Sequence, residues 1–539
     1  MTTGGKPRRK PEKRASAVKK AARLLGRPLG EAPRDRLVTD RSGPLAARLF
    51  HKLLAVIFGI AWLSLGAQVH TLIGSRGLLP LAPFIDAVRS RDLSLFDVPT
   101  IFLWASSDAA LTAGIGAGLA LAAAAFFGLA PRLCFGLSTL LYLSYATAGR
   151  TFLSFQWDNL LLECGALAAL LPRDAKARWA HVLFRVLLFK LYWESGLAKW
   201  QSPIHDWHDG SAMTFYYETA PLPTRLAHAA HALPSIWHHI EGWLTLVLEL
   251  AVPLAIFGPR WARLSAFAAF TGFQVVNAAT ANYGFFCYLS GALHVFLLGD
   301  RDLARARAWI ERRVRGLRRS RAWLRSVRLF LRRRARALVS LQSLRRRPRW
   351  LVARRSAALV ACLAYVGLSG IEGVIRFGGE AGRSLATATS GLRELYTPLR
   401  LVNNYHLFAA ITRERIEPEV QTSDGQTWIA HDLRYKPGDV TRPPPLIAPH
   451  QPRVDFQLWF YGLGHSRGIP AYVRGLLENV CRDPGAVSDL FEAPLPAAPA
   501  SARITFWRYR FTTPAERRAT GAWWSRTWVG ATPAQPCPP

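Results

Sequence analysis

Nine apolar stretches fill most of residues 51–374, and no other feature of this sequence constrains the fold as strongly. A transmembrane helix needs about 20 predominantly apolar residues, and a helix satisfies its own backbone hydrogen bonds inside lipid. The stretches lie near residues 51–69, 101–129, 133–148, 152–171, 181–198, 239–257, 262–281, 283–299 and 356–374. They predict an α-helical multi-pass membrane domain with about nine spans.

The charge of the chain is concentrated outside these stretches. The 539 residues carry a formal net charge of +34, of which residues 1–41 hold +9 and residues 301–355 hold +19. Lys and Arg accumulate in the cytoplasmic loops of membrane proteins. If the N-terminal tail is cytoplasmic, the second basic segment, eight spans later, is cytoplasmic too, and the ninth span exports the C-terminal residues. The charge therefore indicates topology, and we expect no nucleic-acid partner.

These patterns divide the chain into five expected segments. They are a basic cytoplasmic tail at 1–45, a transmembrane helical domain of about eight spans at 46–300, an Arg-rich cytoplasmic amphipathic linker at 301–355, a last transmembrane helix at 356–375, and an exported C-terminal domain at 400–530. In the linker, apolar residues recur at approximately helical spacing, at Trp309, Leu317, Trp323, Leu324, Val327 and Leu331. This spacing favours a basic amphipathic helix on anionic lipid. The alternative is a solvated linker that only sets the topology.

The exported domain has a different composition, with short alternating, aromatic and β-branched stretches broken by Gly and Pro. Arg415–Gln421 and Thr427–Tyr435 flank a turn that contains Gly425, which predicts a β-hairpin. The run RITFWRYRF predicts a further strand, and helical pieces are expected at Pro452–Gly462 and Tyr472–Arg482. We expect a small, mainly-β domain with helical additions. It contains no nucleophile elbow, P-loop or Rossmann fingerprint.

Cysteine and histidine residues give no sign of a metal site or cofactor. Of the six Cys, only Cys481 and Cys537 fall in the exported domain, where an oxidising compartment would permit a bridge, although the spacing alone does not decide it. In the loop between the fifth and sixth spans, His205 and His208 lie beside two Asp in HDWHD, but a defined third metal ligand is missing. The aromatic residues of that loop favour a segment lying on the outer leaflet.

Ionisable residues inside the apolar stretches mark either bonding between helices or a functional cavity, and both interpretations stay open. Lys190 and Glu194 are four residues apart on one helix, so they can neutralise each other. Lys199 points away from that face and lies near the end of the span, where a long side chain can reach the interface. Polar residues of other spans are candidate partners: Asp158, Asn159, Glu163, Glu249, Gln274, Asn277 and His294.

Several long sequence blocks resemble the lipase maturation factor family. The segments NNYHLFAAITRERIEPEV and YKPGDVTRPPPLIAPHQPRVDFQLWFYG, between residues 401 and 462, are similar to the C-terminal signature of that family. FQWDNLLLECG, YYETAPLP and RYRFTTPAERRATGAWWSR are similar to further family blocks. The resemblance covers roughly residues 150–300 and 400–530. It implies a multi-pass membrane protein, located in the endoplasmic reticulum in animals, that dimeric secreted lipases need in order to reach an active fold.

On this resemblance, the exported domain would contact an immature secreted protein such as a lipase. Candidate client contacts in the signature region, many of which can equally fix turns and loops, are Asn404, Tyr405, Arg413, Glu414, Asp439, Arg442, Arg453, Asp455 and Trp459. The chain ends in AQPCPP rather than a KDEL-type sequence, and it is rich in Ala and Arg and poor in Lys. We therefore expect a bacterial plasma membrane with the C-terminal domain periplasmic or extracellular, or the endoplasmic reticulum membrane in a eukaryote.

A second, weaker resemblance concerns the fifth span. LYWESGLAKW is similar to the Ala-Gly-x-x-Lys helix of vitamin K-dependent carboxylases, although Glu194 and Ser195 replace the usual small or apolar residues. It implies an intramembrane enzyme in which a desolvated amine serves as a base, with Lys199, Lys190 and Glu194 as candidate catalytic residues. The leading interpretation remains a folding factor without catalysis. A transporter is a third option, without a visible inverted repeat.

Overall fold

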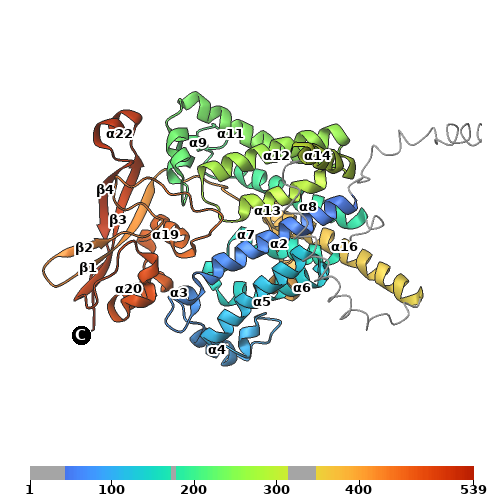
Figure 1. Cartoon of the computed structure of the whole chain (residues 1–539). Coiled ribbons are helices and arrows are strands. Elements are labelled where there is room, and N and C mark those ends of the chain that lie inside the picture. The colour runs from blue at the N-terminus through green and yellow to red at the C-terminus, as the bar shows by residue number, and fades with distance from the viewer. Residues whose placement is uncertain (1–42, 172–177, 314–347, 539) are drawn as a thin grey trace, which may run out of the picture.

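The computed structural model describes residues 43–171, 178–313 and 348–538. Helices make up the part of the chain before residue 400, and a small antiparallel sheet lies at one end of this helical body (Figure 1). The longer helices are α2 Pro44–Gly66, α5 Asp108–Phe127, α6 Pro131–Ala148, α7 Gln156–Leu170, α8 Arg178–Trp200, α11 Ser235–Leu250, α12 Arg260–Thr280 and α16 Pro348–Phe377, and the eight-residue helix α13 Phe286–Leu293 follows α12. Each of the nine apolar stretches coincides with one of these helices.

Nine spans are nevertheless not confirmed. Within the described residues, four helical segments are long and apolar enough to cross a membrane: Pro44–Gly66, Asp108–Phe127, Ser235–Phe257 and Leu359–Phe377. The helix α7 has only 15 residues, and α8 contains Arg185, Lys190 and Glu194 within its length. Apolar character alone therefore identifies fewer spans than the pattern predicted.

Shorter helices connect and cover the long ones. They are α3 Val69–Ile73, α4 Leu81–Arg89, α9 Ala212–Thr219, α10 Arg225–His231, α14 Asp300–Arg313, α17 Gly379–Ala388 and α18 Ser390–Tyr396. Short 3₁₀ turns lie at η2 Ile101–Leu103, η3 Arg150–Leu153, η4 Val252–Phe257, η5 His294–Leu297 and η8 Thr397–Leu399. Small residues permit close packing of the long helices, since a side chain at Gly118 of α5 would collide with the ring of Trp62 on α2.

The first and last elements of the membrane domain meet. The Asp300 carboxylate, at the start of α14, accepts hydrogen bonds from the backbone N–H groups of Gly43 and Ala46, at 2.9 and 3.3 Å. These groups lie at the N-terminus of α2, where an anion is favourable because the N–H groups there have no partner within the helix. The two basic segments are thus joined to the membrane domain at one common place.

The Arg-rich linker is described only at its ends. α14 extends to Arg313, and α16 begins at Pro348, eight residues before the expected start of the last span. Trp309 on α14 is 54 % exposed, and the Arg313 guanidinium lies 5.2 Å from the centre of its ring. The other apolar positions of the expected amphipathic helix, from Leu317 to Leu331, lie outside the described residues, as does the N-terminal tail before residue 43.

The C-terminal domain is built on an antiparallel sheet with the strand order β2-β1-β3-β4. The strands are β1 Arg415–Ser423, β2 Trp428–His431, β3 Ser501–Phe511, β4 Trp524–Ala531 and β5 Gln535–Pro536, which pairs with β3. The predicted hairpin is confirmed as β1 and β2, and Gly425 in its turn has a φ of +103°. The predicted strand RITFWRYRF is confirmed within β3.

Several helices accompany this sheet, and the labelled α19 and α20 lie on the side that faces the helical body (Figure 1). They are α19 Arg453–Leu463, α20 Ala471–Arg482, α21 Pro484–Val487 and α22 Pro514–Thr520, with 3₁₀ turns η9 His465–Arg467 and η10 Ser488–Leu490. The first two confirm the helical pieces expected at these positions. Cys481 at the end of α20 and Cys537 after β5 form a disulfide, which the sequence had left open.

Candidate functional site

An ion pair between Asp158 and Arg453 joins the membrane domain to the C-terminal domain. Asp158 lies in the first turn of α7, and Arg453 is the first residue of α19. The Arg453 guanidinium donates two hydrogen bonds to the two carboxylate oxygens, each 2.7 Å long, and a third to the Phe152 carbonyl. Tyr142 donates its hydroxyl hydrogen to Asp158 at 2.6 Å. This buried pair is hydrogen-bonded on both sides, as stable buried ion pairs require.

The Glu163 carboxylate is a second junction, one helical turn further along α7. It accepts hydrogen bonds from Lys190 of α8 at 3.0 Å and from Tyr365 of α16 at 2.7 Å. Two residues that precede the sheet complete the set, because Tyr405 donates at 2.6 Å and Asn403 at 3.1 Å. Four donors from three parts of the chain therefore surround one carboxylate, and they attach the last membrane helix and the C-terminal domain to the bundle.

The nearest partners of Lys190 and Glu194 lie on other parts of the chain, although the two side chains still attract each other electrostatically. Lys190 forms its ion pair with Glu163 across the helix interface and also donates to Ser369 at 3.1 Å. Glu194 accepts a hydrogen bond from the backbone N–H of Tyr405 at 2.8 Å.

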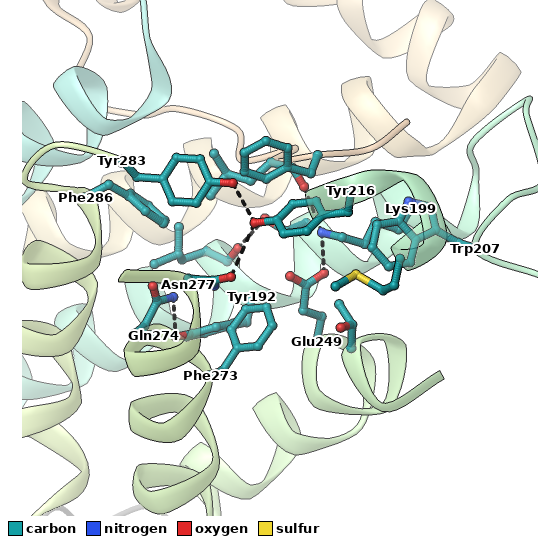
Figure 2. Close-up of a pocket in the computed structure, with 16 residues that line it drawn as sticks. Tyr192, Lys199, Trp207, Tyr216, Glu249, Phe273, Gln274, Asn277, Tyr283 and Phe286 are labelled. Carbon is teal, nitrogen blue, oxygen red and sulfur yellow. Dashed lines mark hydrogen bonds and ion pairs between the residues drawn. The ribbon is translucent and has the colours of Figure 1, made fainter. Parts of the chain in front are cut away.

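Lys199 is enclosed by protein rather than reaching the interface. Its Nζ lies 2.7 Å from a Glu249 carboxylate oxygen of α11 and donates to the Leu407 carbonyl at 2.8 Å. The Trp207 ring centre lies 5.3 Å from the same nitrogen. Figure 2 shows Lys199 between Trp207 and Glu249. The contacts with Glu249 and with the Leu407 carbonyl both require Nζ as the donor, so this arrangement leaves no free amine for use as a base.

A cavity of about 50 Å³ lies beside this ion pair. Figure 2 shows its lining, which is mainly apolar and aromatic: Leu191, Tyr192, Ser195, Lys199, Trp207, Met213, Tyr216, Thr245, Glu249, Phe273, Gln274, Asn277, Tyr283, Phe286, Leu407 and Phe408. The Tyr216 and Tyr283 hydroxyls are 2.5 Å apart, and Asn277 Oδ1 lies 3.5 Å from the Tyr216 hydroxyl. A volume of this size holds a few water molecules, which is far less than a lipid chain needs.

A polar chain extends from the cavity into the bundle. Gln274 donates its side-chain N–H to the Tyr192 hydroxyl at 3.0 Å, and that hydroxyl lies 3.1 Å from His294 Nε2. His294 Nδ1 lies 3.1 Å from the Thr271 hydroxyl. Gln274 and His294 therefore share one hydrogen-bonded chain, whereas Asn159 is on α7 and its buried amide oxygen has no hydrogen-bond partner among the described residues.

Three of the nine candidate client contacts are buried inside the protein. Tyr405, Arg453 and Asp455 are each no more than 2 % exposed. Tyr405 and Arg453 form the two junctions described above. The prediction that these three residues contact a client is wrong for this arrangement, because their side chains expose no surface to a second protein.

The other six candidates have internal partners to varying degrees. Asn404 donates to the Glu372 carbonyl, the Trp459 indole N–H donates to the Thr219 carbonyl, and Arg442 donates to the Leu433 carbonyl. The exposed ones are Arg413, which lies over the ring of Phe215, Glu414, which pairs with Arg508, and Asp439, which accepts the N–H of Thr441. These three remain accessible to a partner.

The sequence did not reveal a buried charge cluster under the sheet. Glu417 on β1 lies 2.5 Å from Arg415 and 2.6 Å from Lys436. Asp455 lies near this cluster, where burial raises the pKa of its carboxyl to about 6 despite the opposing charge of Lys436. The alternation of Arg and Glu along RIEPE was the available signal, since such residues share one face of a strand.

The two histidines of the HDWHD loop lie against each other. His205 Nδ1 lies 2.9 Å from His208 Nδ1. Asp206 accepts hydrogen bonds from the backbone N–H groups of Trp207 and Ile411. In the parts of the chain that the structure describes, no three His, Cys, Asp or Glu side chains converge as metal ligands.

Comparison with known proteins relates both domains to one family. Residues 45–305 match the lipase maturation factor transmembrane domain, and residues 401–534 match the lipase maturation factor C-terminal domain. Human lipase maturation factor 2 is 30 % identical over 586 residues, which cover 90 % of this chain and 82 % of that protein. Bovine lipase maturation factor 1 is 30 % identical, with 89 % and 86 % covered. No solved structure matches the chain.

Proposed function

Because the chain belongs to the lipase maturation factor family, we propose that it is a membrane-embedded maturation factor that assists the assembly of secreted proteins, with lipases as its clients. The observation that carries this proposal is the match of both domains, in the same order, to the two domains of that family. The client, the compartment and the orientation are proposed as well.

The buried junctions give the proposal a physical basis. The pair of Asp158 and Arg453 and the contacts of Glu163 with Tyr405 connect the C-terminal domain to helices of the membrane domain. Groups buried and paired in this way resist separation, because each would otherwise remain as an uncompensated charge. The C-terminal domain would therefore stay at the membrane surface, where an exported chain first becomes accessible.

The orientation and compartment are proposed from charge and redox chemistry. The basic tail and the Arg-rich linker would be cytoplasmic, with the linker against anionic lipid, and the C-terminal domain would lie on the opposite side. The disulfide between Cys481 and Cys537 supports an oxidising compartment for that domain. In a bacterium this is the periplasm or the exterior, as the composition suggested. The relatives named above are vertebrate proteins, so the endoplasmic reticulum is the corresponding proposal for a eukaryotic host.

Deletion of the gene in its host tests the proposal. We expect the secreted lipases to lose activity per molecule, measured as enzymatic activity divided by the amount of lipase antigen, and to regain it on complementation with the intact gene. A secreted enzyme unrelated to lipases serves as a control for general export. Unchanged specific activity of every secreted lipase and esterase would refute the proposal.

The intramembrane enzyme related to vitamin K-dependent carboxylases remains a separate hypothesis. Lys199 borders the cavity, and its Nζ is held by Glu249 and by the Leu407 carbonyl. A catalytic role would require this ion pair to open, since the nitrogen donates to both partners.

A further inference from the structure

The strand β4 forms an open edge of the sheet. It spans eight residues, from Trp524 to Ala531, and it is the terminal strand beyond β3. The opposite edge is the four-residue strand β2. Proteins usually shorten, cover or bend such edges, because unpaired backbone groups attract another strand. From Arg526 to Trp528 every residue of β4 is exposed, and the register with β3 shifts just beyond Trp528, so the regular, accessible part of this edge is the stretch that ends at Trp528.

The backbone of β4 has hydrogen-bonding groups that point away from β3. The Thr512 N–H donates to the Trp523 carbonyl across the hairpin, whereas the Trp524 N–H donates in the other direction, to the Val440 carbonyl. In an antiparallel ladder successive residues alternate between the two sides. Arg526 and Trp528 therefore direct their N–H and C=O groups outward, beyond the end of the contact with Val440.

Two side chains of this edge, Arg526 and Trp528, pack against residues of the neighbouring strands. Trp528 is 53 % exposed, and its ring lies at a right-angle contact with Trp507, with 5.3 Å between the ring centres. Arg526 lies over the ring of Trp507 at 4.3 Å and pairs with Glu419 at 2.8 Å. Contacts of this kind fix the side chains before any partner binds, which lowers the entropy cost of binding.

The hairpin of β3 and β4 is strongly basic. Residues 501–531 contain six Arg and a single acidic residue, Glu516. Arg508 and Arg510 on β3 are both more than half exposed, and they pair with the exposed carboxylates of Glu414 and Glu516 at 3.3 and 3.5 Å. A partner that adds to this edge would therefore be favoured if it carried acidic residues, and an aromatic residue could pack on Trp528.

We propose that β4 is the docking edge for an extended, acidic segment of an immature client, which pairs with its backbone as an additional strand. This inference rests on the proposed function and names how the client is recognised. Strand addition uses main-chain hydrogen bonds, so it tolerates different sequences and requires an extended segment rather than a finished fold. The segment leaves when its own sheet forms, because it then pairs within the client.

Two substitutions at one position separate the backbone from the side chain. Trp528→Ala removes the indole but keeps the outward N–H, whereas Trp528→Pro removes both, and proline is compatible with an edge strand. The probe is a fluorescent peptide of alternating Val and Glu with one Tyr, titrated onto the full-length protein in lipid nanodiscs. We expect Trp528→Ala to weaken binding a few-fold and Trp528→Pro to weaken it about tenfold more.

The controls keep this result specific. Ile429→Ala removes an exposed apolar side chain from β2 at the opposite edge and should leave peptide binding unchanged. The peptide with Lys in place of Glu, and the peptide with N-methylated backbone, should both bind weakly. Retention of the disulfide between Cys481 and Cys537 and equal resistance to protease show that each variant is folded.

Equal affinity of the alanine and proline variants would overturn the proposal, as would absence of binding of the acidic peptide to the intact protein. A dimer of the intact protein that Trp528→Pro dissociates, measured by light scattering, would assign the edge to a second copy of this chain and overturn it too. The proposed function is tested separately: full restoration of lipase activity by Trp528→Pro would refute only the docking edge, whereas normal lipase activity in the deletion strain would refute the function.

Discussion

Arg453 of the C-terminal domain and Asp158 of the membrane domain form a two-point ion pair across 295 positions of sequence. Neither side chain is more than 1 % exposed, and the Tyr142 hydroxyl and the Phe152 carbonyl satisfy further hydrogen bonds of the pair. The junction between the domains is therefore part of the folded interior, and the two domains are expected to move and unfold together.

Breaking this pair on one side should destabilise the protein strongly. Arg453→Met leaves the Asp158 carboxylate buried without its cation, which costs about 3–5 kcal/mol in comparable buried pairs. Thermal unfolding in nanodiscs should show the loss, and limited proteolysis should show release of the C-terminal domain. The double variant Arg453→Met with Asp158→Leu should recover part of the stability. Arg467→Met, at an exposed position of the same domain, is the matched control; an equal effect there would contradict the prediction.

The pair of Lys199 and Glu249 distinguishes a structural role from a catalytic one. Lys199→Met alone should lower stability because Glu249 is buried at 4 % exposure. Adding Glu249→Gln removes the uncompensated charge, so we expect the double variant to regain both its thermal stability and its ability to restore lipase activity. A double variant that is stable but inactive would instead support Lys199 as a catalytic residue.

Asp455 should make the stability of the C-terminal domain depend on pH. Burial raises the pKa of this carboxyl from 3.8 to about 6, so the folded state holds a proton that the unfolded state has released. Protonation of Asp455 therefore contributes to the free energy of unfolding, on the order of 3 kcal/mol. The contribution is complete below pH 4 and is lost as the pH rises through 6. The melting temperature of the intact protein should fall between pH 4.5 and pH 7 relative to that of Asp455→Asn. Parallel curves for the two proteins would refute this assignment.

The disulfide between Cys481 and Cys537 should stabilise the C-terminal domain. It closes a loop of 56 residues, for which the chain-entropy model gives about 4 kcal/mol. We expect Cys537→Ser to lower the melting temperature under oxidising conditions and to make it insensitive to dithiothreitol. Cys134→Ser, which replaces a buried free thiol in the membrane domain, should leave the reductant effect intact.

Local patterns predicted individual elements well and their partners poorly. The glycine in the turn identified β1 and β2, and the helical pieces expected at Pro452–Gly462 and Tyr472–Arg482 correspond to α19 and α20. The strand β4 was missed because its middle, Ser525 to Thr527, is polar and because Trp524 is its single buried residue. Strand propensity reflects such surroundings as much as the residues themselves.

The candidate site shows the same division. Charged residues within apolar stretches were identified correctly as positions that need partners, since a lone charge is costly there. Helical spacing suggested Glu194 as a partner of Lys190, whereas the ion pair forms with Glu163 of α7. Glu163 and Glu249 were among the candidate partners from other spans, and they pair with Lys190 and Lys199. Sequence spacing describes one helix at a time, whereas burial selects partners from every element that packs nearby.

The Asp300 carboxylate of α14 binds the backbone at the start of α2, and this contact bears on how the chain can be divided. It makes residues 43 and 300 spatial neighbours, and these positions nearly coincide with the limits of the family match at 45 and 305. Domains whose ends lie close together tolerate circular permutation and insertion. The helical module thus closes on itself, and packed side chains such as those of Glu163 and Arg453 attach α16 and the C-terminal domain to it.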